Sequence, residues 1–200
     1  CVIDRNNTIP NEFLSGEKIL ITHAHKIFNG KSIFGIANNC TKVGTIVLDD
    51  SHACIDVLKN SFTVTISSET IYNKILTLFS DDLIEQGEGS YLDIKTGEYD
   101  TFMMVPYWAW NSKRMELLSI LSEYSSIDEI QFVWPLMKDK IIEYSCFVSG
   151  NKIEISPYSV SVEQFGTFSR ANRRILMSAT TQEDIFFVKG LNFSSDAVTN

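Results

Sequence analysis

The sequence predicts an α/β fold in which a portion of a parallel sheet is interrupted by an α+β insert. Two apolar, β-branched runs predict parallel strands, one at 45–50 (TIVLDD) and one that begins at Arg173 (RRILMSAT). The residues between these runs carry both helical and strand-like patterns. We therefore expect residues 1–60 and 171–200 to form the sheet portion, and residues 61–170 to form the insert.

Strands and helices are expected to alternate along the chain. The expected elements are strands at 18–23, 45–50 and 61–67, helices at 52–60, 69–86 and 110–124, a hairpin at 143–158 and a strand from 173. Ser67 or Ser68 followed by Glu69 is typical of a helix start, and the sequence GEG after Gln86 interrupts the helical spacing. Within the hairpin, Ser149-Gly150-Asn151 is typical of the turn between two strands.

The composition is that of a globular protein, because 44% of the 200 residues are hydrophobic and 21% are charged. No apolar run approaches the roughly 18 residues that cross a bilayer, so we expect a cytoplasmic protein without a membrane partner. The formal net charge of −8 excludes binding of nucleic acid through bulk electrostatics alone. Four cysteines without metal-binding spacing are expected to be reduced and structural.

Two adjacent acids, Asp49 and Asp50, end the apolar run at 45–50 and are followed by Ser51 and His52. Strands are depleted in Asp, so this pair needs an explanation. A carboxylate at the carboxyl end of a parallel strand can hold Mg²⁺ on a nucleotide while its neighbour orients water. An acid pair in this position also serves as a turn or a helix cap. The residues themselves leave both interpretations open.

Three segments, in the same order as in the family, resemble motifs of superfamily 2 helicases of the DEAD/DEAH-box type. VLDDSH and ILMSAT resemble the motif pair shared by those helicases. KILITHAHKIFN looks like a strand and loop in their first RecA-like domain, where a Thr contacts the nucleic-acid backbone. The stretches WAW, FVWPL and IEISPY look like bacterial helicase-like proteins with a long insert between the two motifs.

The resemblance implies a fold and a set of residue roles. The fold is a partial RecA-like parallel sheet of the P-loop NTPase type with an α+β insert. The implied roles are Mg²⁺ binding through water for Asp49, positioning or deprotonation of the attacking water for Asp50, nucleic-acid contact for Thr22, and coupling of nucleotide state to strand movement for His52, Ser178 and Thr180. The family usually has Glu where Asp50 stands, so the carboxylate here is one methylene shorter.

The phosphate loop of such a motor is not recognisable in the sequence. Gly30-Lys31-Ser32 matches only the end of G-x-x-x-x-G-K-[ST], because His25 stands where the first Gly belongs. In the family this loop precedes the Thr motif, which here means before residue 1, and a second RecA-like domain would follow residue 200. We therefore expect part of an ATP-dependent helicase or translocase that uses ATP and Mg²⁺, binds DNA or RNA, and hydrolyses no ATP without the rest of the parent chain.

Two other functions are compatible with the same residues. A Mg²⁺-dependent hydrolase that uses Asp49 and Asp50 on a different substrate would be active as the isolated chain. A non-catalytic module that binds nucleic acid or protein would be insensitive to loss of the motifs. The expected partners are DNA or RNA and the rest of the parent chain, and an exposed sheet edge would also allow self-association.

Three further groups of residues have both a functional and a structural interpretation. His23 and His25 have metal-binding spacing but no third ligand at hand. The aromatic run at 106–110 and Trp134 would stack bases when exposed and fill the core when buried. A basic cluster beside the ILMSAT strand would contact phosphates or face solvent, and it comprises Arg170, Arg173 and Arg174.

Overall fold

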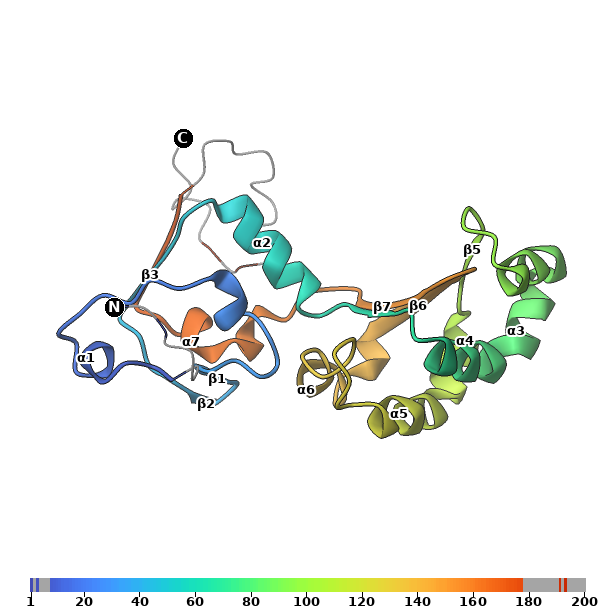
Figure 1. Cartoon of the computed structure of the whole chain (residues 1–200), viewed down its shortest axis with the longest axis horizontal. Helices are drawn as coiled ribbons and strands as arrows, with labels where there is room; N and C mark the ends of the chain where they lie inside the picture. Colours follow the sequence, from blue (N-terminus) through green and yellow to red (C-terminus); the bar gives the residue numbers. More distant parts are fainter. Residues whose placement is uncertain (2, 4–7, 178–190, 192, 194–200) are drawn as a thin grey trace. The chain divides into compact units, whose positions relative to one another are not determined.

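The structure, a computed structural model, describes residues 1, 3, 8–177, 191 and 193, and divides the chain into two compact units (Figure 1). The first unit comprises residues 1–61 and 160–200, and the second comprises residues 62–159. Parallel and antiparallel sheets are both present, so the mixed α/β class is confirmed. Among the described helices, none combines the length and the apolar composition that crossing a bilayer requires.

Two parallel strands, β3 (Thr45–Leu48) and β8 (Arg173–Leu176), organise the first unit. Thr45 lies opposite Arg173 and Leu48 opposite Leu176, so the two strands end at the same level. Side chains of β3 alternate between exposed and buried, whereas a nearly continuous apolar run is typical of a parallel strand that is buried on both faces. The reason is that the described residues cover only one face of this strand pair, and Val47 remains 51% exposed.

The other elements of the first unit are short, apart from one helix. They are α1 (Asn11–Leu14), η1 (Ala24–Lys26), β1 (Gly35–Ile36), β2 (Asn39–Cys40), α2 (Ser51–Asn60), η3 (Val162–Gln164) and α7 (Gly166–Ser169). Phe28 packs edge-to-face against Phe165 and Phe168, each with ring centroids 5.3 Å apart. The Thr167 hydroxyl donates to the Thr41 carbonyl at 2.9 Å. Residues 160–170 therefore belong to the first unit, whereas we expected them in the insert.

The segment at 18–23 is not the buried strand that its apolar sequence predicts. Ile19 is 83% exposed and Ile21 is 72% exposed. The segment is extended, and the Ile21 amide donates to the Cys1 carbonyl at 3.0 Å in a single bridge. No described strand forms a ladder with this segment, so Ile19 and Ile21 stay exposed while Leu20 is half-buried.

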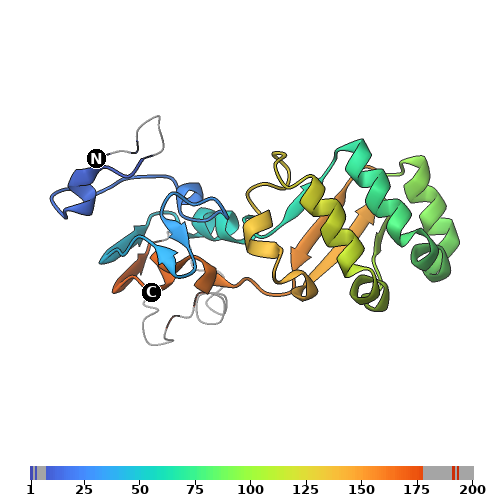
Figure 2. The same ribbon diagram turned by 90° about the horizontal axis from the view of Figure 1, so that it is seen from below.

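The second unit is a four-stranded antiparallel sheet with helices over one face (Figure 2). The strand order is β4 (Val64–Ile66), β7 (Ile153–Pro157), β6 (Tyr144–Ser149) and β5 (Phe102–Met104). The helical segments are α3 (Glu69–Thr96), α4 (Tyr107–Ser112), α5 (Arg114–Glu123), α6 (Trp134–Met137) and η2 (Ile141–Glu143). The predicted hairpin at 143–158 is confirmed as β6 and β7.

Helix α3 begins at Glu69 as predicted, but it extends beyond the predicted end. The carboxylate of Glu129 accepts the amides of Ser67 at 3.0 Å and Ser68 at 3.4 Å, in place of a serine side-chain cap. The backbone leaves the helical conformation at Gly87, where GEG interrupts the pattern, and the helix then resumes. The predicted break is thus a kink, because apolar residues such as Tyr91 and Ile94 return the later turns to the core.

The tryptophans of the second unit show which aromatic residues are structural. Trp110 is buried, its indole N–H donates to the Ile141 carbonyl at 3.0 Å, and its ring stacks on Phe79 at 6.1 Å. Trp134 packs against the same core. By contrast, Trp108 is 64% exposed. Base stacking by Trp110 is therefore excluded by its position in the core.

Raising the pH above 9 is expected to destabilise the second unit. Burial raises the pKa of the Cys146 thiol in the folded chain well above its ordinary value of 9.0. The native state keeps a proton that the unfolded state releases, so this stability is complete below pH 9 and is lost as the pH rises further. The loss approaches about 1.4 kcal/mol per pH unit. Urea unfolding followed by tryptophan fluorescence between pH 7 and 10 measures it.

Cys146→Ala provides the control for this pH dependence. Tyr144 also has a pKa raised by burial, but its ordinary value of 10.0 lies higher, so the thiol dominates between pH 9 and 10. The variant should be less stable at pH 7 because it leaves a cavity. Its free energy of unfolding should also depend much less on pH between pH 9 and 10. An unchanged pH dependence would show that another group titrates.

Candidate functional site

The two motif segments lie side by side at the carboxyl ends of β3 and β8. The Met177 amide donates to the Leu48 carbonyl at 2.9 Å, and the Ser51 amide donates to the Met177 carbonyl at 2.9 Å. These bonds continue the strand pair one residue beyond its ladder and join it to the start of α2. Asp49 and Asp50 form the bend between β3 and α2. Ser178 and Thr180, the hydroxyl residues of ILMSAT, lie outside the described residues.

Asp50 has a left-handed backbone, with φ 49° and ψ 67°. Among the described residues other than glycine, only Ala37 shares a positive φ. Asp and Asn adopt this conformation more readily than other L-residues, and residues held in it occur in tight turns and at functional sites. It turns the chain sharply enough for α2 to begin at the next residue. Asp50 occupies the N-cap position, yet its side chain accepts no capping hydrogen bond from the described part of the chain.

Asp49 and Asp50 are both exposed. Two half-buried residues follow them in the first turns of α2, the imidazole of His52 and the thiol of Cys54. The Cys54 thiol donates to the Asp49 carbonyl at 3.4 Å. Burial raises the pKa of Cys54, and the negative charges of Asp50 and Asp49 raise it further. Among the described residues of the site, the acid pair is thus the most exposed to solvent.

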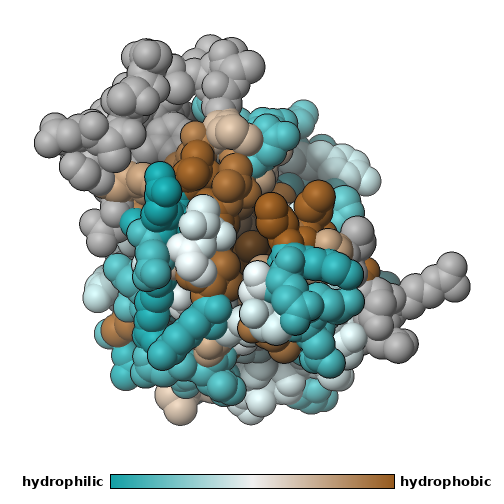
Figure 3. Space-filling model, turned by 90° about the vertical axis from the view of Figure 1, so that its left-hand side faces the viewer, coloured by the Kyte–Doolittle hydropathy of each residue, from teal (hydrophilic) through white to brown (hydrophobic). Residues whose placement is uncertain are grey.

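Thr22 and Asp49 both line a groove with a volume of about 350 Å³. The apolar walls of this groove come from the extended segment at 19–21 and from β3, and Cys54 also lines it. Figure 3 shows the face of the first unit that lies on the left in Figure 1. On this face, hydrophobic side chains gather in a hollow that hydrophilic side chains border. Sequence reasoning missed the groove, because it forms between segments that lie more than twenty residues apart in the chain.

The exposed acid pair has the ligand chemistry that Mg²⁺ requires. Magnesium prefers hard oxygen ligands and is usually bound by one or two carboxylates together with phosphate oxygens. Asp49 and Asp50 supply two such carboxylates at the carboxyl end of a parallel strand. The described residues contain no cluster of three or more His, Cys, Asp or Glu side chains that could enclose a metal, and His23 and His25 are exposed.

Gly30-Lys31-Ser32 does not have the structure of a phosphate loop. These residues lie in turns, and the Lys31 amide donates to the side-chain oxygen of Asn29 at 2.8 Å. The next element is strand β1. A phosphate loop must open a helix whose first amides hold the phosphates, so this segment is not one.

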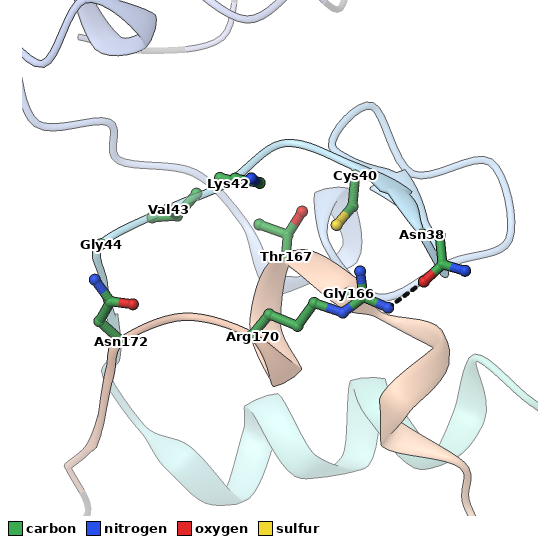
Figure 4. A pocket seen from close by; sticks show the side chains of 9 residues that line it. All are labelled: Asn38, Cys40, Lys42, Val43, Gly44, Gly166, Thr167, Arg170 and Asn172. Carbon is green, nitrogen blue, oxygen red and sulfur yellow. Dashed lines mark hydrogen bonds between the residues drawn. The ribbon is translucent and has the colours of Figure 1, made fainter.

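A second, basic pocket lies at the opposite end of the strand pair (Figure 4). It has a volume of about 300 Å³, and Gly44 and Asn172, which directly precede β3 and β8, line it together with Lys42 and Arg170. The Arg170 guanidinium donates to the side-chain oxygen of Asn38. No acid lines this pocket among the described residues.

The predicted basic cluster is divided by the fold. Arg170 lines the basic pocket, whereas the Arg174 guanidinium lies over the rings of Phe168 at 5.4 Å and Phe193 at 4.4 Å. Arg174 also donates to the Leu191 carbonyl at 2.9 Å, and burial lowers its pKa. Arg173 is exposed. Arg174 is therefore a packing residue, while Arg170 is exposed and holds Asn38 at the basic pocket.

Comparison with known protein families and with curated proteins identified no relative of this chain. The case for a function therefore rests on the residues and their geometry: an exposed acid pair at the end of one parallel strand, beside the strand that leads to the Ser178 and Thr180 motif.

Proposed function

We propose that this chain is part of the motor of an ATP-dependent nucleic-acid helicase or translocase, from its first RecA-like domain. One observation carries the proposal. VLDDSH and the strand of ILMSAT, separated by more than a hundred residues in the sequence, lie on neighbouring parallel strands that end at the same level. A motor that couples hydrolysis to movement needs its metal-binding acids and its coupling hydroxyls at one such edge.

In this proposal each residue of the site has a separate role. Asp49 binds Mg²⁺ through water, and the ion neutralises charge on the phosphates of ATP when bound. The exposed Asp50 carboxylate orients the attacking water and accepts its proton. Thr22 contacts the nucleic-acid backbone, and His52, Ser178 and Thr180 couple nucleotide state to movement.

The left-handed backbone supports this assignment for Asp50. A side chain that capped α2 would use its oxygens on helix amides, whereas Asp50 makes no such bond with described residues. Its carboxylate is free to face solvent at the strand end, as a water-positioning group must. The shorter Asp in place of the family's usual Glu demands closer approach of the water, because catalysis tolerates a misplacement of only about 1 Å.

The proposal assigns the phosphate loop and the second RecA-like domain to the rest of the parent chain. The apolar groove beside Thr22 is the surface we propose for contact with that chain, since Ile19 and Ile21 are exposed there. A cytoplasmic location and binding of DNA or RNA are parts of the same proposal.

Steady-state ATP hydrolysis by the complete protein, with and without single-stranded DNA or RNA, tests the proposal. We expect Mg²⁺-dependent hydrolysis that one of the nucleic acids stimulates, and no hydrolysis by residues 1–200. Phosphate release by residues 1–200 from another phosphorylated substrate would favour a Mg²⁺-dependent hydrolase. Binding of nucleic acid without hydrolysis in a folded complete protein would favour a non-catalytic binding module.

A further inference from the structure

The sheet of the second unit has an uncovered face with exposed aromatic side chains. Along β5, Met103 is 6% exposed and faces the helices, whereas Phe102 is 69% exposed and Met104 is 41% exposed. Alternation places these two residues on the other face of the sheet. Single exposed apolar side chains are common on proteins, whereas contiguous exposed apolar patches mark interaction sites. The question is therefore whether these side chains form one patch.

These side chains line a groove of about 550 Å³, which we call the aromatic groove. Its side chains include Tyr99, Phe102, Phe147, Asn151, Lys152 and Glu154. The rings of Phe102 and Phe147 lie 6.5 Å apart at 57° to each other, and Tyr99 is 74% exposed. Three aromatic rings thus offer accessible surface in one groove.

The backbone holds the aromatic groove in place without a ligand. Gly150, in the β6–β7 turn, lies so close to the loop after α3 that an added Cβ would be 2.4 Å from the Glu98 carbonyl oxygen. The Tyr72 hydroxyl donates to the Ser149 carbonyl at 2.6 Å and fixes the same turn to α3. The loop that carries Tyr99 is therefore positioned before binding, which reduces the entropy lost when a partner binds.

The second unit carries all of the net negative charge of the chain. Residues 62–159 contain 15 acidic and 7 basic residues, whereas the remaining residues contain 10 of each. Glu98 and Asp100 flank Tyr99 in the sequence, and Glu154 lines the groove. None of these three carboxylates forms a salt bridge with a described residue. Lys152 is the single cation among the described groove residues.

We propose that the aromatic groove binds a basic polypeptide segment that carries arginine or lysine together with apolar side chains. Guanidinium and ammonium groups bind to aromatic faces and are attracted by neighbouring carboxylates. Apolar side chains of the same segment cover Phe102 and Met104. Nucleic acid also stacks on aromatic rings, but a unit with a net charge of −8 repels phosphates. The charge thus selects a cationic partner.

Fluorescence anisotropy with the full chain and a labelled peptide of alternating arginine and leucine tests the proposal. Two probes of the same length serve for comparison, a glutamate–leucine peptide and a thymidine oligonucleotide. We expect binding of the basic peptide alone, weakened by salt because opposite charges attract. Replacing both Tyr99 and Phe102 with Ser should weaken binding by roughly tenfold or more. Glu98→Gln with Asp100→Asn should weaken the salt dependence, because these two carboxylates flank Tyr99.

Trp108→Ser is the matched control, because Trp108 is as exposed as Phe102 but does not line the groove. It should leave the affinity unchanged. Thermal unfolding of each variant, followed by circular dichroism, identifies any variant that fails to fold. The proposal is overturned by a basic peptide that does not bind, by equal loss of affinity in Trp108→Ser, or by binding of the oligonucleotide at Tyr99 and Phe102.

Discussion

Asp50→Asn in the complete protein is expected to lower nucleic-acid-stimulated ATP hydrolysis by roughly a hundredfold or more. The amide cannot accept the proton of the attacking water, and a general base contributes about 10²–10⁴ to a rate. Asn is the substitution of choice, because Asn and Asp both tolerate the left-handed backbone that Asp50 adopts with φ 49°. The change therefore removes the carboxylate and keeps the bend between β3 and α2.

Asp56→Asn is the matched control, since Asp56 is an exposed acid on the same helix. It should leave hydrolysis unchanged. Asp49→Asn should instead raise the Mg²⁺ concentration needed for half-maximal activity, because that carboxylate holds the ion in our proposal. Full hydrolysis by Asp50→Asn would show that Asp50 is not a working base.

Gly166→Ala is expected to destabilise the first unit by about 2 kcal/mol, as overpacking of a buried site does. An added Cβ would lie 2.2 Å from the Ala37 carbonyl oxygen and 2.7 Å from the Cys40 sulfur. Part of the obstacle is backbone, so the start of α7 must move away from the turn at Ala37. A loss of this size lowers the unfolding midpoint of a unit of about 100 residues by roughly 10 °C.

Differential scanning calorimetry follows the unfolding of both units and should show the lowered midpoint in the first unit. All three tryptophans lie within residues 62–159, so tryptophan fluorescence reports on the second unit alone and should show an unchanged transition. Gly44→Ala is the control in the first unit, because a Cβ there meets no atom within 4 Å. Equal midpoints for Gly166→Ala and the wild type would mean that the close approach relaxes without cost.

Local patterns in the sequence predicted the elements whose stabilising contacts are near in the chain. The hairpin of β6 and β7 follows from its turn residues and is confirmed. The start of α3 at Glu69 is confirmed too, but the cap comes from the distant Glu129 and not from the serines that predicted it. The segment at 18–23 was predicted wrongly, because a strand also needs a neighbour and the sequence does not show whether one exists. Residues 160–170 were assigned to the insert, because the contact that joins Phe165 to the distant Phe28 leaves no local sequence pattern.

The candidate site was predictable in its residue types and not in its shape. The position of Asp49 and Asp50 at the end of a strand follows from the apolar run before them. The left-handed backbone of Asp50 lies beside the bond from the Ser51 amide to the Met177 carbonyl, and the groove shared by Thr22 and Asp49 depends on contacts between distant segments. Neither is visible in a local sequence pattern. The aromatic groove was not predicted, since β5 lies in a stretch without clear periodicity.

The pairing of β3 with β8 has a consequence for folding kinetics. Thr45 and Arg173 are paired across 128 positions, so closing that loop directly is entropically costly. The second unit begins with β4 and ends with β7, and Val64 pairs with Ile155. Once this sheet has formed, two short segments remain to be closed. One runs over 19 positions from Thr45 to Val64, and the other over 18 positions from Ile155 to Arg173. The closure cost falls by about 1 kcal/mol, so the inserted unit should fold first and speed assembly of the edge that carries Asp49 and Asp50.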